Sequence, residues 1–101
     1  MLRFEWDPNK AKQNFEIHGV SFDEASTAFR DTLSLAIYDP LHSEEEDRFV
    51  LIGNSHKDRL LVVVHTERGN NIRLISARKT SKKERTQYEE NAERSRHAGR
   101  I

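Results

Sequence analysis

The longest apolar run of the sequence is Leu60-Leu61-Val62-Val63-Val64, which continues into His65-Thr66. Its length and its β-branched residues are typical of a β-strand. Successive side chains of a strand point to opposite faces, and here all five are apolar. We therefore expect this strand to be central and covered on both faces. Residues 67–70 then form a turn, and residues 71–78 return as a second strand.

The turn between these two strands sets which side chains face each other. Gly69-Asn70 suits a two-residue hairpin loop with glycine at its first position. This loop predicts that Val64 lies opposite Ile75 and Leu61 opposite Arg78. His65 and Arg78 would then lie on the same face of the sheet, and a shift of one residue would separate them.

Capping signals place three helices around this hairpin. Asp7-Pro8 is typical of a helix start, and Gly19 of the end of that helix. Ser21 to Glu24 and Ser81 to Glu84 match the capping box, in which the serine and the glutamate each bond to the other's backbone N–H. The second helix is predicted to end near Asp31, and the third to begin at the Ser81 box.

Apolar patterns predict three further strands, at residues 2–6, 33–38 and 48–53. The acidic segment 41–47 is expected to be an exposed loop. The predicted order is β-α-α-β-β-β-β-α, a small antiparallel sheet with helices packed on it. This order defines an α+β fold.

A chain of 101 residues is expected to form one domain. We place that domain at residues 1–92. The last helix has only Tyr88 and Ala92 as apolar residues at i, i+4 spacing. Residues 93–101, which are rich in arginine, are therefore predicted to be a mobile basic tail.

The composition limits the chemistry. The sequence has no cysteine, which excludes disulfides, thiolate catalysis and cysteine-bound zinc, and its five histidines lack the paired spacing of metal ligands. We expect no cofactor. Charges interrupt the apolar residues at the N-terminus, unlike in a signal peptide, and no apolar run approaches membrane-spanning length. A cytoplasmic protein is the resulting expectation.

The formal net charge of zero conceals two halves of opposite sign. Residues 1–58 carry six Lys and Arg against twelve Asp and Glu, whereas residues 59–101 carry eleven against five. The densest positive charge lies at residues 78–85, directly after the hairpin. A basic half permits a nucleic-acid partner, although two halves that neutralise each other would give the same balance.

Three groups of residues carry a family resemblance. They are Phe4-Glu5-Trp6-Asp7, Lys10, Asn14, His18-Gly19-Val20, Phe22, Glu24-Ala25 and Phe29; then Asp39, His42-Ser43, Glu46, Arg48 and Gly53; then Leu61-Val62-Val63-Val64, Arg73, Ile75-Ser76-Ala77-Arg78, Glu84 and Tyr88. In this combination, which covers about residues 2 to 90, the sequence resembles the BrnT toxins. It departs from them at Ile17, where many relatives have a basic residue, and in the tail beyond Tyr88.

The resemblance implies the toxin of a type II toxin–antitoxin system, with the compact fold of RelE-like ribonucleases. It implies an RNA-cleaving enzyme that arrests translation. It also implies neutralisation by a BrnA-like antitoxin with a ribbon-helix-helix DNA-binding part. Operator DNA would be contacted only through that antitoxin.

A metal-free ribonuclease must deprotonate a 2′-hydroxyl, stabilise the charge that builds on the phosphate, and protonate the leaving oxygen. The catalytic candidates are Arg78, Lys10, His42, His65 and Tyr88, and the RNA-binding candidates are Arg48, Arg73, Lys79, Lys82, Lys83 and Arg85. Arg78 is the first choice, because it ends a covered strand beside the basic segment and could hold a phosphate with two hydrogen bonds.

Each catalytic candidate also has a structural interpretation. Arg78 could pair with the acidic loop, and Lys10 could be a solvated surface lysine. His42 could be a loop histidine beside carboxylates, His65 a histidine at the edge of the core, and Tyr88 the core anchor of the last helix.

Three functions therefore remain open at the level of sequence. The first is a toxin ribonuclease. The second is a non-catalytic module that binds RNA or the ribosome through the same basic residues, although few aromatic residues are available for base stacking. The third is a subunit whose acidic and basic halves bind a partner protein.

Overall fold

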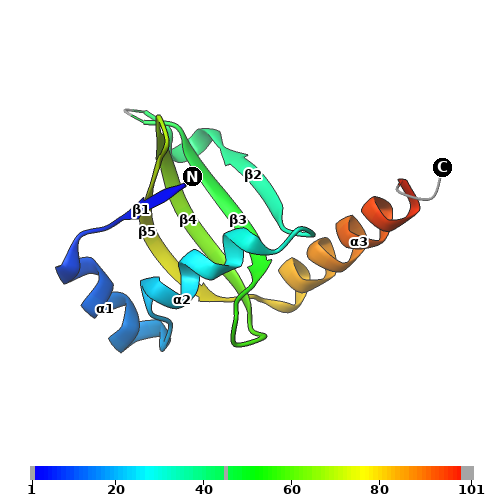
Figure 1. Cartoon of the computed structure of the whole chain (residues 1–101), viewed down its shortest axis with the longest axis horizontal. Helices are drawn as coiled ribbons and strands as arrows, with labels where there is room; N and C mark the ends of the chain where they lie inside the picture. Colours follow the sequence, from blue (N-terminus) through cyan, green and yellow to red (C-terminus); the bar gives the residue numbers. More distant parts are fainter. Residues whose placement is uncertain (1, 45, 99–101) are drawn as a thin grey trace.

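The structure, a computed structural model, describes residues 2–44 and 46–98. In chain order it contains β1 (Arg3–Glu5), α1 (Pro8–His18), α2 (Phe22–Thr27), the 3-10 helix η1 (Ala28–Arg30), β2 (Leu35–Asp39), the 3-10 helix η2 (Pro40–His42), β3 (Arg48–Asn54), β4 (Leu60–Arg68), β5 (Asn71–Lys79) and α3 (Lys82–Ala98). Over these residues the strands form one sheet in the order β1-β5-β4-β3-β2. The α+β fold and the predicted order of elements are confirmed (Figure 1).

The sheet is antiparallel from β2 to β5, as predicted, whereas the short β1 pairs with β5 in parallel. Beyond β1, the side chain of Asn14 on α1 completes the edge of β5. Its Nδ2 donates to the carbonyl oxygens of Ala77 at 2.8 Å and Val20 at 2.9 Å, and its Oδ1 accepts from the Ala77 N–H at 3.0 Å. Asn14 is buried. These bonds take the place of a neighbouring strand and fix α1 against β5.

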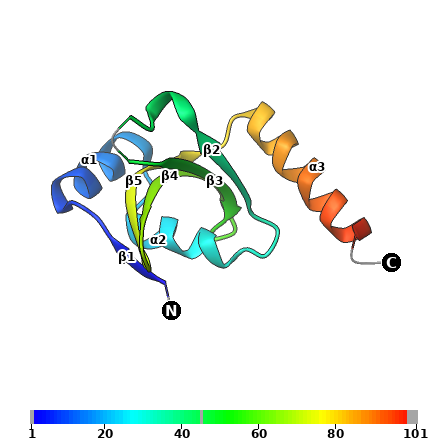
Figure 2. The same ribbon diagram turned by 90° about the horizontal axis from the view of Figure 1, so that it is seen from above.

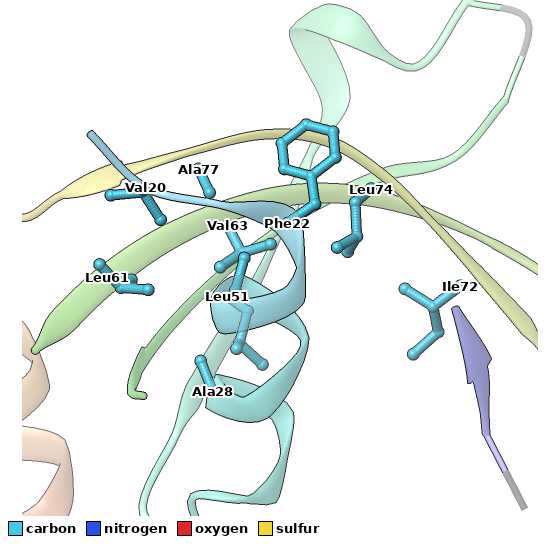
Figure 3. Close-up of a cluster of buried hydrophobic side chains, with 10 residues drawn as sticks. Val20, Phe22, Ala28, Leu51, Leu61, Val63, Ile72, Leu74 and Ala77 are labelled. Atoms are coloured by element: carbon cyan, nitrogen blue, oxygen red, sulfur yellow. The ribbon is translucent and has the colours of Figure 1, made fainter. Parts of the chain in front are cut away.

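The curved sheet holds α2 on its concave face (Figure 2). Apolar side chains of α2 and its flanking residues meet those of β3, β4 and β5 there, in a core made of Val20, Phe22, Ala25, Ala28, Leu51, Leu61, Val63, Ile72, Leu74 and Ala77. Figure 3 shows most of these side chains gathered between α2 and the sheet. This cluster is the main hydrophobic core of the domain.

A second core lies on the opposite face, under the start of α3. Tyr88 packs there with Ile52, Leu60 and Val62. Leu60 to Val63 are all buried, so the predicted double coverage of this strand is confirmed for those four residues, while Val64 is half-buried.

The far end of α3 projects from the body of the molecule in both views (Figures 1 and 2). The helix continues to Ala98, so residues 93–98 are helical. The mobility predicted for residues 93–101 stays a prediction, and residues 99–101 lie outside the described part of the chain.

The predicted hairpin is confirmed at its loop, where Gly69 has a φ of 60° and Arg68 faces Asn71. Farther along, a bulge at Val64/His65 shifts the register by one residue. As a result Val64 faces Ser76 instead of Ile75, and Leu61 faces Lys79 instead of Arg78. The predicted register was wrong beyond the bulge, because an extra residue in one strand leaves no distinct pattern in the sequence.

The bulge changes which side chains share a face. Arg78 faces Val62 on β4 and therefore lies on the opposite face of the sheet from His65. The prediction that His65 and Arg78 lie on the same face was wrong. Instead Arg73 and Arg78 lie on the same face, because their partners Thr66 and Val62 are four residues apart on β4. This is the face on which α3 packs.

The helix caps mostly follow the prediction. Asp7 caps α1, and Gly19 ends it with a φ of 69°. Ser81 and Glu84 form a complete capping box. Ser21 accepts from the N–H of Glu24 at 3.0 Å, but the Glu24 carboxylate bonds to Ser55 and Arg59 instead of returning to Ser21. Only half of that capping box is therefore formed. Glu24 is buried, and a buried carboxylate is stabilised more by a cation than by a backbone N–H.

Candidate functional site

A cavity of about 470 Å³ opens on the same face of the sheet as α3. It lies at the opposite end of the strands from that helix. Strand pairing builds its floor, since Arg48 on β3 faces Thr66 on β4, which in turn faces Arg73 on β5. Other lining residues come from α1, from the acidic loop and from the end of β4, and they include Lys10, His42, Glu44, Glu46 and Arg68. We call this site the cationic cavity. Four cationic side chains, each from a different helix or strand, thus line the cationic cavity: Lys10, Arg48, Arg68 and Arg73.

Two polar atoms of the floor lack partners. Within residues 2–44 and 46–98, the Arg48 Nε and the Thr66 Oγ1 are buried and make no hydrogen bond. Thr66 is only 4% exposed. Burying a polar atom without a partner is unfavourable, so it is uncommon in native proteins. Both groups can donate a hydrogen bond, but neither atom is open to solvent, so an anion reaches them only by displacing the side chains that cover them.

Lys10, Arg48 and Arg73 form no ion pair with any other described residue. Arg68 differs from them, because it pairs with Glu46, its Nε lying 3.3 Å from Glu46 Oε2. This pairing holds the pKa of Glu46 below its ordinary value, and the nearby Thr66 hydroxyl and the charge of Arg73 add smaller effects in the same direction. Glu46 is exposed, so an incoming phosphate could replace its carboxylate on Arg68.

His42 is the histidine that the structure places at the cationic cavity. It ends the η2 turn, and its Nδ1 lies 2.8 Å from Asp39 Oδ2. Its side chain is 62% exposed, so the ring is accessible to a ligand in the cavity. Of the predicted residues, the structure brings together Lys10, His42, Arg48 and Arg73.

Arg78 lies outside this group. Its two terminal nitrogens lie 2.8 and 2.7 Å from the two carboxylate oxygens of Glu84. This bidentate pair lowers the pKa of Glu84 to about 2 and raises the pKa of Arg78. The structural interpretation of Arg78 as an ion-pair residue therefore has a geometric basis, with Glu84 as the partner instead of the acidic loop.

His65 and Tyr88 lie in the two cores. The His65 ring packs between Phe29, at a centroid distance of 4.8 Å, and Phe49, at 5.8 Å, and burial lowers its pKa. The Tyr88 hydroxyl donates to Asp31 Oδ2 at 2.6 Å. Burial and this carboxylate raise the pKa of Tyr88 to about 12. Both environments favour the structural interpretation of these residues.

The remaining basic candidates lie at the opposite end of the strands. Lys79 and Arg85 line a smaller cavity of about 320 Å³ beside Asp58 and Arg59. Lys82 and Lys83 are exposed on the first turn of α3. The dense basic segment therefore does not join the cationic cavity.

Thr66 and Arg68 line the cavity but were not among the predicted site residues. The sequence contained enough information to find Thr66. A hairpin loop at Gly69-Asn70 places Thr66 opposite Arg73, which was already a candidate. In the described residues, no group of His, Asp and Glu side chains could hold a metal ion. No described helix is long and apolar enough to cross a membrane.

The fold and the cavity define a class: a small α+β protein with an open cationic site suited to phosphate groups. Comparison with protein families makes this specific. The model of the family described as "Ribonuclease toxin, BrnT, of type II toxin-antitoxin system" matches residues 6–84. The chain belongs to this family, which confirms the resemblance found in the sequence.

A solved structure agrees with this assignment. The crystal structure of the Brucella abortus ribonuclease toxin, BrnT, matches with a TM-score of 0.59 and 21% sequence identity, over 81% of this chain and all of that one. At this identity the match shows a shared fold. No curated protein matches the sequence.

Proposed function

We propose that this chain is a metal-independent endoribonuclease that binds and cleaves RNA in the cationic cavity. The observation that carries the proposal is the convergence of Lys10, Arg48, Arg68 and Arg73 on one open cavity. Among the described residues Lys10 and Arg73 form no ion pair, so both can hold neighbouring phosphate oxygens. Membership of a ribonuclease toxin family supplies the reaction class.

We assign one lining residue of the cavity to each proton transfer and two to the phosphate charge. His42 takes the proton of the 2′-hydroxyl, and the 2′-oxygen forms a bond to the adjacent phosphorus. Arg48 and Arg73 stabilise the extra negative charge on the phosphate oxygens. The bond from phosphorus to the 5′-oxygen breaks, and the Lys10 ammonium gives that oxygen a proton. The products are a 2′,3′-cyclic phosphate and a 5′-hydroxyl end.

Membership of this family also supports a proposal for the cellular role. A type II toxin acts with an antitoxin, and the resemblance favours a BrnA-like antitoxin with a ribbon-helix-helix part that binds operator DNA. Cleavage of cellular RNA by the free toxin would arrest translation. The purified antitoxin should therefore abolish cleavage when it is added in equimolar amount.

The test is RNA cleavage by the purified chain in the presence of EDTA, with the 3′ ends of the products analysed. Arg73→Ala should lower the rate about 100-fold, because it removes a cation from the developing phosphate charge. Arg30→Ala is the matched control, since Arg30 is exposed on η1, outside the cavity, and should cleave at the wild-type rate. Arg78→Ala, if folded, should cleave nearly normally.

Two results would count against the proposal. Loss of cleavage in folded Arg78→Ala, with Arg73→Ala fully active, would move the active site to the end of β5. A wild-type chain that binds RNA without cleaving it would favour the non-catalytic RNA-binding alternative.

A further inference from the structure

Asp39 is a carboxylate next to the cationic cavity that the proposed chemistry does not use. It is the last residue of β2, and its Oδ2 lies 2.8 Å from the Nδ1 of His42. Its side chain is 23% exposed, compared with 62% for His42. Asp39 is thus the better packed partner of the pair.

The backbone around this pair is held by a second set of bonds. The Ser43 hydroxyl donates to the carbonyl oxygen of Asp39 and accepts from the backbone N–H of Arg48 at 2.9 Å. Asp39 and Arg48 are also directly paired between β2 and β3. The η2 turn that carries His42 is therefore closed at its base and tied to the strand that carries Arg48.

This arrangement selects one form of the imidazole. A neutral histidine has one N–H and one lone pair, and the bond made by one nitrogen decides the role of the other. Because the Asp39 carboxylate can only accept, Nδ1 must carry the proton. Nε2 is then the nitrogen with a free lone pair, and the ring that holds it lines the cavity with Lys10, Arg48 and Arg73.

We infer that Asp39 is a positioning residue for RNA cleavage, which holds His42 so that its Nε2 accepts the proton of the 2′-hydroxyl. The inference rests on the proposed function and adds a residue to it. Asp39 touches neither the RNA nor the reacting atoms. Without Asp39, the neutral ring would turn and carry its proton mainly on Nε2. A protonated Nε2 has no free lone pair, so it could not act as the base.

The test combines kinetics and a spectrum of the free protein. Asp39→Ala should lower kcat 10- to 100-fold and change KM less than twofold, because the phosphate contacts remain. Asp39→Asn, which keeps an acceptor oxygen, should recover part of the lost kcat. Combining Asp39→Ala with His42→Ala should be no worse than His42→Ala alone, because the two residues act as a unit. Asp47→Ala is the control, as Asp47 is an exposed carboxylate of the same loop whose partner is Tyr38.

The spectrum separates this inference from the proposed function. Long-range ¹H–¹⁵N NMR of the wild-type chain, at a pH where His42 is neutral, should show the Nδ1–H tautomer, and Asp39→Ala should show mainly the Nε2–H tautomer. If the wild-type chain cleaves no RNA, the proposed function fails, and this spectrum alone decides the Asp39–His42 contact. If the chain cleaves RNA but Asp39→Ala keeps the wild-type kcat, or the double variant is slower than His42→Ala by the product of both effects, the inference is wrong.

Discussion

Thr66→Val should change stability and RNA binding in opposite directions. The Thr66 hydroxyl is buried and unpartnered among the described residues, while valine has nearly the same shape and suits a central strand. A buried hydroxyl without a partner costs roughly 1–3 kcal/mol, so its removal should stabilise the domain by about 1 kcal/mol. The same change removes a donor from the cavity floor. RNA affinity should fall about tenfold, which corresponds to roughly 1.4 kcal/mol.

The matched control is Thr27→Val, where the hydroxyl is fully used. Thr27 Oγ1 donates to the Glu24 carbonyl at 2.6 Å and accepts from the His56 N–H at 2.9 Å. Its loss should destabilise the domain by about 1–2 kcal/mol and leave RNA binding unchanged. Urea unfolding followed by the fluorescence of the single tryptophan measures stability, and anisotropy with an uncleavable 2′-O-methyl RNA measures binding. A Thr66→Val variant that is less stable than wild type and binds RNA normally would refute the interpretation of the cavity floor.

Three further predictions concern the framework of the site, each measured by urea or acid unfolding. Asn14→Ala should lower stability by roughly 2–4 kcal/mol, because it leaves the buried N–H and carbonyl of Ala77 unpaired, and a loss below 0.5 kcal/mol would contradict this. The hydrogen bond from Arg59 lowers the pKa of Glu24 from 4.5 to about 2, so its contribution, roughly 3 kcal/mol, is complete above pH 4.5 and is lost as the pH falls towards 2. Glu24→Gln should abolish that part of the acid sensitivity, and an unchanged acid transition would argue against the pair. Tyr88→Phe should lower stability by about 1–2 kcal/mol and leave RNA cleavage at the wild-type rate, whereas a large loss of kcat in the folded variant would return Tyr88 to the catalytic residues.

The sequence predicted the parts of the fold that depend on local chemistry. Asp7 and Gly19 mark the ends of α1 because a capping carboxylate and a left-handed residue act within a few positions. The covered β4 strand was recognisable because an apolar run that includes both alternating faces needs partners on both sides. These signals are short-range, and they hold whatever the rest of the chain does.

The site was harder to predict because it depends on register and on distant elements. Ile75 is the extra residue of the bulge in β5. Because of this bulge, Arg78 lies on the face of the sheet that carries Arg73, and not on the face that carries His65. Arg78 was the strongest sequence candidate because of its basic neighbours, yet Glu84 engages its guanidinium. Lys10 and Arg48 come together only through tertiary packing, which no spacing in the sequence encodes.

The most direct measurement of where RNA binds is an NMR titration of the uniformly ¹⁵N-labelled chain with a short uncleavable 2′-O-methyl RNA. The cationic cavity predicts that the backbone amide signals of Arg48, Thr66 and Arg73 shift together and saturate at one Kd. Arg73→Ala should weaken that Kd and reduce the dependence of log Kd on log salt by about 0.7, the value for one phosphate contact to a single strand. Shifts confined to residues 78–85, with no change at Thr66, would contradict the assignment and place the RNA at the start of α3.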